Sequence, residues 1–215
     1  MSKEESEKKI SCKALRKQME KVQDEKRYEH TLGVAFTAAS LAMRYGADVR
    51  KAQIAGLLHD CAKCMTNEER INLCKKNKIE ITEIEHANPF LLHAKVGAFL
   101  AKEKYDITDN EILSAISYHT TGRPEMTLLE KIVYIADYIE PGRKTAPNLD
   151  EVRRLAFENL EEALYKILSD TLEYLQTSDQ KTDPMTRQTY EYYRNIRENK
   201  NGFQRNDKTC NAGTD

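Results

Sequence analysis

The stretch AGLLHDCAK, residues 55–63, looks like the interior of a buried helix, yet it carries three ionisable side chains within five positions. In a helix, His59 and Lys63 share one face because they are four residues apart, and Asp60 lies about 100° further round. A buried, unpaired carboxylate is costly, so Asp60 needs a cation, strong hydrogen-bond donors or a proton. The stretch therefore indicates a polar site inside a helical core.

The composition indicates one helix-rich domain. The chain has 215 residues, of which 40% are hydrophobic, with only 8 Gly and 5 Pro, and this length fits a single core. Apolar residues recur at three and four positions rather than alternating, so we expect an all-α helical bundle. The formal net charge of −1 argues against a nucleic-acid partner. No run approaches the ~18 apolar residues that span a membrane, so we expect no membrane partner.

The cysteines and the N-terminus favour a cytoplasmic protein. The chain has 5 cysteines, an odd number, and its opening MSKEESEKKI lacks the apolar segment of a signal peptide. Reduced thiols are typical of the cytoplasm. Cys61 and Cys64 have C-x-x-C spacing, but a zinc site needs a second ligand pair and a redox pair normally opens a helix. We interpret both as ordinary helix residues.

Capping signals divide the chain into helices. A Thr followed three residues later by Glu can satisfy the free amides of a new helix, and this pattern occurs at Thr66/Glu69, Thr108/Glu111 and Thr127/Glu130. Gly46 fits a helix C-cap, and Pro89 fits a first turn. The predicted helices are 10–24, 28–45, 48–64, 67–77, 89–104, 109–119, 128–140, 150–175 and 184–199. We expect one domain over 1–199 and, because 200–215 is polar and aperiodic, a disordered tail.

Further ionisable residues lie on the inward faces of separate predicted helices. His119 continues one apolar stripe, Asp137 lies on or at the edge of another, His93 opens a third, and His30 begins an Ala-rich helix. Imidazoles and carboxylates together suit divalent Fe, Mn, Zn or Co, and helices can bring such ligands together in a bundle core. The residues therefore indicate a metal site. Lys63 is too basic to bind a metal at neutral pH but can hold an anionic oxygen, which indicates a phosphate substrate.

The order of these residues is similar to a known signature. The sequence resembles the H…HD…D pattern of the HD-domain metallophosphohydrolases at His30, His59-Asp60 and Asp137. The subset of this family that binds two metals has additional histidine ligands, and His93 and His119 resemble these. Three longer segments resemble the bacterial YqeK family of symmetrical dinucleoside-tetraphosphate hydrolases over roughly residues 10–198. They are KRYEHTLGVAFTAASLAMRYGADVRKAQIAGLLHDCAK (26–63), LLHAKVGAFLAKE (91–103) and ISYHTTGRPEMTLLEKIVYIADYIEPGR (116–143).

The resemblance implies a ligand set for two divalent ions. One ion would be held by His30, His59, Asp60 and Asp137. The second would be held by Asp60, His93 and His119, with Asp60 bridging the two. The family suggests iron, with Mn, Co or Zn as alternatives. The HD-type domain would have its core at about 26–142 and further helices at 150–199.

The resemblance also implies an activity and its residues. A hydroxide between the two ions would attack phosphorus at the centre of a dinucleoside tetraphosphate such as diadenosine tetraphosphate, which would give two nucleoside diphosphates. The expected catalytic residues are Asp60, Lys63 and Asp137. The expected substrate-binding residues are Arg27, Lys63, Thr120, Thr121, Arg123 and Arg143. We assign His86 to the surface or to a position behind the ligands.

Other functions fit the same residues. The chain could be another HD phosphohydrolase, acting on a nucleoside monophosphate, a dNTP or a cyclic nucleotide. It could also be a module that senses nucleotides without turnover, or a helical scaffold in which the polar residues form buried ion pairs. A homodimer is an assembly that the sequence allows.

Overall fold

The structure, a computed structural model, describes residues 11–177 and 182–210, with side-chain surroundings described up to residue 199. Within these ranges every regular element is a helix, which confirms the all-α fold. The elements are α1 (Cys12–Val22), α2 (Glu25–Tyr45), α3 (Val49–Leu58), α4 (Asn67–Asn77), α5 (Glu83–Ala87), the 3-10 helix η1 (Pro89–Leu92), α6 (His93–Tyr105), α7 (Asn110–Tyr118), α8 (Leu128–Ile139), α9 (Leu149–Glu158), α10 (Leu160–Thr177) and α11 (Pro184–Cys210).

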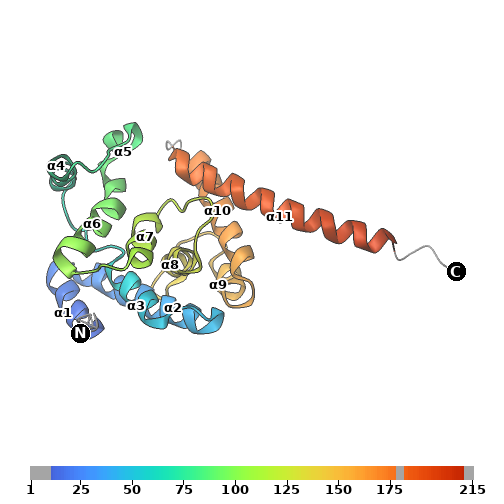
Figure 1. Cartoon of the computed structure of the whole chain (residues 1–215), viewed down its shortest axis with the longest axis horizontal. Coiled ribbons are helices and arrows are strands. Elements are labelled where there is room, and N and C mark those ends of the chain that lie inside the picture. The colour runs from blue at the N-terminus through green and yellow to red at the C-terminus, as the bar shows by residue number, and fades with distance from the viewer. Residues whose placement is uncertain (1–10, 178–181, 211–215) are drawn as a thin grey trace, which may run out of the picture.

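The centre of the bundle is built on the pair α2 and α3, which pack along each other, with α7 and α8 against them (Figure 1). Small residues let α2 and α3 approach closely. A Cβ atom added at Gly56 would lie 2.7 Å from Cα of Ala35, so only glycine fits at this crossing. Leu41, Leu57, Ile116 and other fully buried side chains fill the space between the four helices. The close contact brings the start of α2 near the end of α3.

A smaller apolar cluster lies beside this core. Cys74 of α4, Leu92 of η1 and Val96 of α6 pack around Ala62, which follows α3. The cluster fixes the chain that leaves α3 against the start of α6. Two segments far apart in the sequence are thereby held together, and both carry residues of the site described below.

Several helix boundaries match the sequence. Thr66 and Thr127 begin α4 and α8 with the expected capping boxes, and Gly46 ends α2 at φ 71°. Pro89 opens a helical turn, as expected, although this turn is the 3-10 helix η1. Thr108 is not the cap of α7, because Asp109 accepts from the amides of the first turn instead.

Other boundaries differ from the prediction. The predicted helix 150–175 is two helices, because the chain is extended at Asn159 and the side chain of Asn159 accepts from Glu162 N at 3.3 Å. A short helix, α5, begins with a capping box at Thr82 and was not predicted. The predicted helix 48–64 ends at Leu58.

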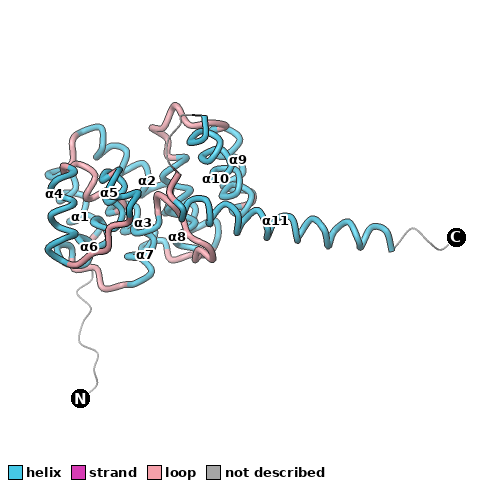
Figure 2. The backbone as a smooth tube through the Cα atoms, turned by 90° about the horizontal axis from the view of Figure 1, so that it is seen from above, coloured by secondary structure: helices cyan, strands magenta, loops and turns pink. Residues whose placement is uncertain are grey.

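The last helix, α11, is longer than expected. It runs to Cys210 instead of 199 and projects away from the other helices (Figures 1 and 2). Apolar spacing reveals only the part of a helix that packs, and it gives no signal for a part that projects. Residues 211–215 of the expected tail lie outside the described residues, and the division into a domain over 1–199 and a tail stays a prediction.

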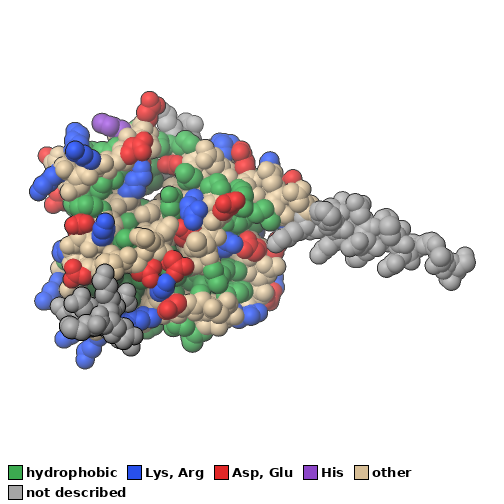
Figure 3. Space-filling model, in the orientation of Figure 1, with side chains coloured by type: hydrophobic (Ala, Val, Ile, Leu, Met, Phe, Trp, Pro, Cys, Tyr) green, Lys and Arg blue, Asp and Glu red, His purple; other side chains and the backbone are tan. Residues whose placement is uncertain are grey.

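The surface carries both signs of charge. On the face in Figure 3, Lys and Arg side chains alternate with Asp and Glu over the part coloured by type. Among the described residues, every helix is too short or too polar to cross a membrane.

Candidate metal centre

Four imidazole rings meet where α2, α3, α6 and α7 come together. His30 lies on α2, His59 directly follows α3, His93 opens α6, and His119 directly follows α7. Their Nε2 atoms face one another in pairs, with 3.3 Å between His59 and His30 and 3.2 Å between His93 and His119. The rings of His59 and His119 join the two pairs, with their centroids 5.0 Å apart. Four side chains from separate segments thus form one cluster.

The other nitrogen of each ring, Nδ1, is held by the protein. Nδ1 of His59 lies 2.7 Å from Gly56 O, that of His93 lies 2.6 Å from Phe90 O, and that of His119 lies 2.7 Å from Ile116 O. Each of these carbonyls is three residues before its histidine. A carbonyl only accepts, so each Nδ1 carries the proton and each Nε2 presents a lone pair to the centre.

The same contacts explain why α3 ends early. The carbonyl of Gly56 is the group that the amide of Asp60 would bond if the helix continued, and the ring of His59 bonds it instead. The chain then turns through tighter bonds, from Cys61 N to Leu58 O at 3.1 Å and from Lys63 N to Asp60 O at 3.0 Å. The His-Asp pair therefore lies in a turn at the end of a helix, not inside it.

The carboxylate of Asp60 lies between the two histidine pairs. Its Oδ1 is 3.4 Å from His93 Nε2 and 3.5 Å from His119 Nε2. Its Oδ2 is 3.5 Å from His59 Nε2 and 3.9 Å from His30 Nε2. One oxygen thus faces each pair, which is the arrangement needed to bridge two ions.

Asp137 completes one side of the centre. It projects from the last turn of α8, and its Oδ1 lies 3.1 Å from His30 Nε2 and 4.0 Å from His59 Nε2. Its side chain is 25% exposed, whereas that of Asp60 is 3% exposed. The centre therefore opens to solvent on the side of Asp137 and is closed behind Asp60.

The protonation of these groups suits metal binding. Burial acts to raise the pKa of Asp60, but the polar groups around it, the Lys63 amine among them, hold that pKa well below its ordinary value. Burial and the neighbouring Lys63 lower the pKa of His93 to about 3. A charged carboxylate and a neutral imidazole are the forms that bind a divalent ion.

The donor set fits one or two divalent ions. The side-chain donors within 4.8 Å of one another form three overlapping groups, which are His30/His59/Asp60, His59/His119/Asp137 and Asp60/His93/His119. Oδ1 of Asp60 is buried without a hydrogen-bond partner among the described residues, and an orphaned carboxylate oxygen of this kind calls for a cation. Imidazole nitrogen with carboxylate oxygen suits Fe, Mn, Co or Zn. The ligand roles of the six residues stay predictions.

Two expected substrate-binding residues, Lys63 and Thr120, lie beside the pair formed by His93 and His119. Nζ of Lys63 is 3.1 Å from His93 Nε2 and 3.9 Å from Asp60 Oδ1. Burial lowers the pKa of the Lys63 amine. The hydroxyl of Thr120 lies 3.2 Å from the Nε2 atoms of both His93 and His119. Both side chains can therefore reach an oxygen bound at this side.

Two arginines contact the carboxylates. Arg27 Nη1 lies 2.7 Å from Asp60 Oδ2, and Arg143 Nη2 lies 2.9 Å from Asp137 Oδ1. Each guanidinium is about one-third exposed. They stand between the carboxylates and solvent, where an anionic substrate would approach.

The structure places the two remaining candidates elsewhere. Arg123 bonds the buried Glu130, with 3.0 Å from Nε to Oε1 and 2.9 Å from Nη2 to Oε2. The hydroxyl of Thr121 donates to Gly122 O at 2.9 Å. Neither group contacts the centre. His86 is exposed at the end of α5, as the surface assignment expected.

Two residues at the centre were missed in the sequence. Glu140 accepts from Nδ1 of His30 at 3.1 Å, and Gln23 donates from Nε2 to Asp60 O at 3.2 Å. Glu140 follows Asp137 by three residues, so it shares that side of α8, and this spacing was an available signal. Gln23 directly follows α1 and shows no such pattern.

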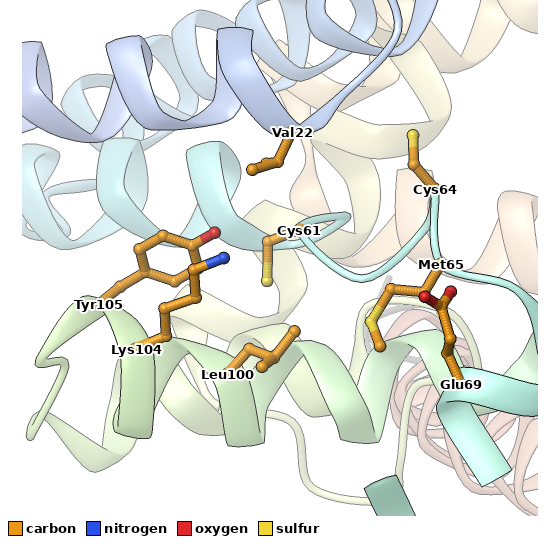
Figure 4. A pocket seen from close by; sticks show the side chains of 8 residues that line it. All are labelled: Val22, Cys61, Cys64, Met65, Glu69, Leu100, Lys104 and Tyr105. Carbon is orange, nitrogen blue, oxygen red and sulfur yellow. The ribbon is translucent and has the colours of Figure 1, made fainter. Parts of the chain in front are cut away.

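The C-x-x-C pair lines a pocket of its own (Figure 4). Cys61 donates to Gly97 O at 3.4 Å, and burial raises the pKa of its thiol to about 12. Cys64 is exposed, and the two sulfur atoms point in different directions. The geometry agrees with a structural interpretation of these cysteines.

The HD domain class is defined by a histidine on one helix, an adjacent His-Asp pair and a later aspartate that meet in a helical bundle. The model of the HD domain family matches residues 27–142, and the chain belongs to this family. It is 46% identical to the symmetrical bis(5'-nucleosyl)-tetraphosphatase of Bacillus subtilis (strain 168), over 78% of this chain and 89% of that protein. The enzyme with the same description from Staphylococcus aureus is 40% identical, over 78% and 86%.

A solved structure has the same fold. The crystal structure of a predicted HD superfamily hydrolase involved in NAD metabolism from Clostridium acetobutylicum superposes with a TM-score of 0.83. It is 41% identical, and the match covers 86% of this chain and 98% of that chain.

Proposed function

We propose that the chain is a symmetrical bis(5'-nucleosyl)-tetraphosphatase. It adds water across the central phosphoanhydride bond of a dinucleoside tetraphosphate and releases two nucleoside diphosphates, so diadenosine tetraphosphate gives two ADP. The activity named for the Bacillus subtilis and Staphylococcus aureus relatives supports this proposal, because the similarity extends over most of each chain. The single observation that carries it is the position of Asp60, with one oxygen toward each histidine pair.

The six donors would hold two divalent ions, and we propose iron as the physiological metal. His30, His59, Asp60 and Asp137 would hold one ion, and Asp60, His93 and His119 the other. Two such ions lower the pKa of a water and neutralise charge on a phosphoryl oxygen. The mixed nitrogen and oxygen donor set supports iron or manganese over magnesium or calcium, which prefer oxygen alone.

The cations around the centre have a separate task. The leaving diphosphate carries negative charge, and Lys63 is placed to neutralise it because its amine lies beside Asp60 and His93. Arg27 and Arg143, each about one-third exposed beside the carboxylates, would receive the outer phosphates. Thr120 would donate its hydroxyl to the phosphate nearest His119.

We also propose that the enzyme works in the cytoplasm. The four cysteines whose side chains the structure describes are all free thiols, which supports a reducing compartment. The homodimer stays a prediction, and sedimentation of the purified chain measures it.

Product analysis tests the function. Purified protein loaded with Fe²⁺ or Mn²⁺ is mixed with diadenosine tetraphosphate, and the nucleotides are separated by chromatography, with the metal content measured in parallel. We expect ADP alone. ATP with AMP, or free orthophosphate, would indicate another HD phosphohydrolase, and bound ADP without turnover would indicate a sensor. A chain that binds no metal would overturn the hydrolase and leave a scaffold of buried ion pairs.

A further inference from the structure

Glu140 is a buried glutamate whose two carboxylate oxygens both accept hydrogen bonds. It lies directly after α8 and is 4% exposed. Oε1 accepts from Nδ1 of His30 at 3.1 Å, and Oε2 accepts from Gly142 N at 2.5 Å. The proposed reaction gives this carboxylate no contact with phosphate, so its burial beside a predicted ligand needs another explanation.

The chain leaves room for this carboxylate at two glycines. A Cβ atom at Gly33 would lie 2.5 Å from Oε2 of Glu140, and one at Gly142 would lie 3.0 Å from the same oxygen. Gly33 is inside α2, where glycine is unfavourable relative to alanine. It lies three residues after His30, on the same side of the helix. The helix therefore has glycine, a residue that destabilises helices, at the position where any side chain would displace Glu140.

The loop that carries Glu140 is itself fixed. Arg153 of α9 donates to Ile139 O at 3.1 Å, to Glu140 O at 2.9 Å and to Arg143 O at 3.0 Å. Arg143 N also donates to Glu140 O at 3.0 Å. These bonds hold the backbone on both sides of the carboxylate, so its position does not depend on His30 alone.

His30 thus differs from the other three histidines. Their Nδ1 atoms donate to neutral carbonyls, whereas His30 donates to a carboxylate. A carboxylate partner fixes the ring and makes its other nitrogen a stronger donor to a metal. We infer that Glu140 is a positioning residue that strengthens His30 as a ligand, so that the ion held by His30 binds more tightly than it would without this carboxylate. This inference rests on the proposed two-metal function.

The variant Glu140→Gln tests the inference while keeping the size of the side chain. A carboxamide has one acceptor oxygen, so it can serve His30 or Gly142 N but not both. The full chain is stripped of metal and titrated with Mn²⁺, and free Mn²⁺ is followed by electron paramagnetic resonance. We expect two sites in the unaltered chain, and in the variant one of them weakened by about 10–100-fold, the range for lost partners of metal ligands.

Glu130→Gln is a matched control, because Glu130 lies on the same helix, is 1% exposed and bonds Arg123 instead of a histidine. It should lower the melting temperature and leave both Mn²⁺ affinities unchanged. Gly33→Ala is a second route to the same effect. Alanine favours a helix over glycine, so a loss of Mn²⁺ affinity in this variant would come from the displaced carboxylate.

The outcomes separate the two proposals. One weakened site in Glu140→Gln and Gly33→Ala, with Glu130→Gln unchanged, supports the inference. Two sites of unaltered affinity in Glu140→Gln, or equal weakening in Glu130→Gln, would overturn it while the proposed function stands. An unaltered chain that binds no Mn²⁺ would overturn the proposed function, and this inference with it.

Discussion

Nε2 of His93 lies 3.2 Å from Nε2 of His119, and both rings give their only proton to backbone carbonyls at Nδ1. Two lone pairs therefore face the same space inside the protein. The hydroxyl of Thr120 lies 3.2 Å from both nitrogens, and the amine of Lys63 lies 3.1 Å from His93 Nε2. A metal ion between the rings would bind both lone pairs at once, which ties the stability of the fold to metal.

Metal removal should therefore destabilise the chain. With free Mn²⁺ at 100 times its Kd, binding to the folded state alone adds about 2.7 kcal/mol per site. At roughly 2–4 °C per kcal/mol for a domain of this size, one site raises Tm by about 5–11 °C. Thermal unfolding of the stripped and reloaded protein measures this shift. An equal Tm in both samples would contradict a metal centre in the core.

Asp60→Asn should abolish turnover and lose one bound ion. The carboxylate places one oxygen toward each histidine pair, and an amide supplies a single acceptor oxygen. We expect a loss on the order of 10²–10³-fold or more in rate. Bound Mn²⁺ per chain and ADP release are measured together. If the variant retained two ions, Asp60 would not be a bridging ligand.

Lys63→Ala should keep both ions and lose rate. The amine lies beside the centre but is not one of the six donors assigned to the ions, so its removal takes away only charge opposite the leaving diphosphate. We expect kcat to fall by about 10²–10³-fold. Lys104→Ala, which changes an exposed amine over the ring of Tyr105, is the control and should behave as the unaltered chain. A changed metal content in Lys63→Ala would contradict this assignment.

Arg143→Ala should impair catalysis, whereas Arg123→Ala should impair stability. Arg143 contacts Asp137 at the open side of the centre, so its loss should raise KM and lower kcat. Arg123 bonds the buried Glu130 and lies over the ring of Tyr118, away from the centre, so its loss should cost about 1–3 kcal/mol of stability and leave KM unchanged. Steady-state kinetics and urea unfolding of both variants distinguish the two. A raised KM in Arg123→Ala would support its expected role as a substrate-binding residue.

Gly56→Ala should loosen the packing of α2 on α3. The added Cβ would meet Cα of Ala35 at 2.7 Å, and such overpacking costs about 1–3 kcal/mol. Because the crossing sets the distance from His30 to His59, the variant should also bind Mn²⁺ more weakly. Urea unfolding and Mn²⁺ titration measure the two effects. Unchanged stability would show that the helices can part without strain.

The residues at the centre were predictable where they interrupt apolar stripes. His119 and Asp137 stand on faces that are otherwise hydrophobic, and the pair His59-Asp60 ends a buried helix, so inward orientation followed from helical spacing. That these residues meet at one place depends on packing between helices, and this was predicted only from the family resemblance. Glu140 was missed because it lies directly after α8, although its spacing of three residues from Asp137 indicated the same side of the helix.

Helix ends were predictable where a side chain caps the first turn, and less so where a helix stops. Thr66 and Thr127 carry their own signal, because Glu three residues later completes the capping box. The end of α3 depends on the bond from His59 to Gly56 O, and the end of α9 on the side chain of Asn159. The first bond competes with the helix and the second caps the helix that follows, and a hydrophobic pattern records neither.

Three helices finish at the same place, since α3 ends one residue before His59, α7 one residue before His119, and α8 two residues after Asp137. The carboxyl end of a helix carries roughly half a negative charge. These carboxyl ends outnumber the amino end of α6, which His93 opens, so the backbone contributes net negative charge to the centre, which attracts cations and repels polyphosphate. Binding should accordingly be ordered, with the metals first and the nucleotide second.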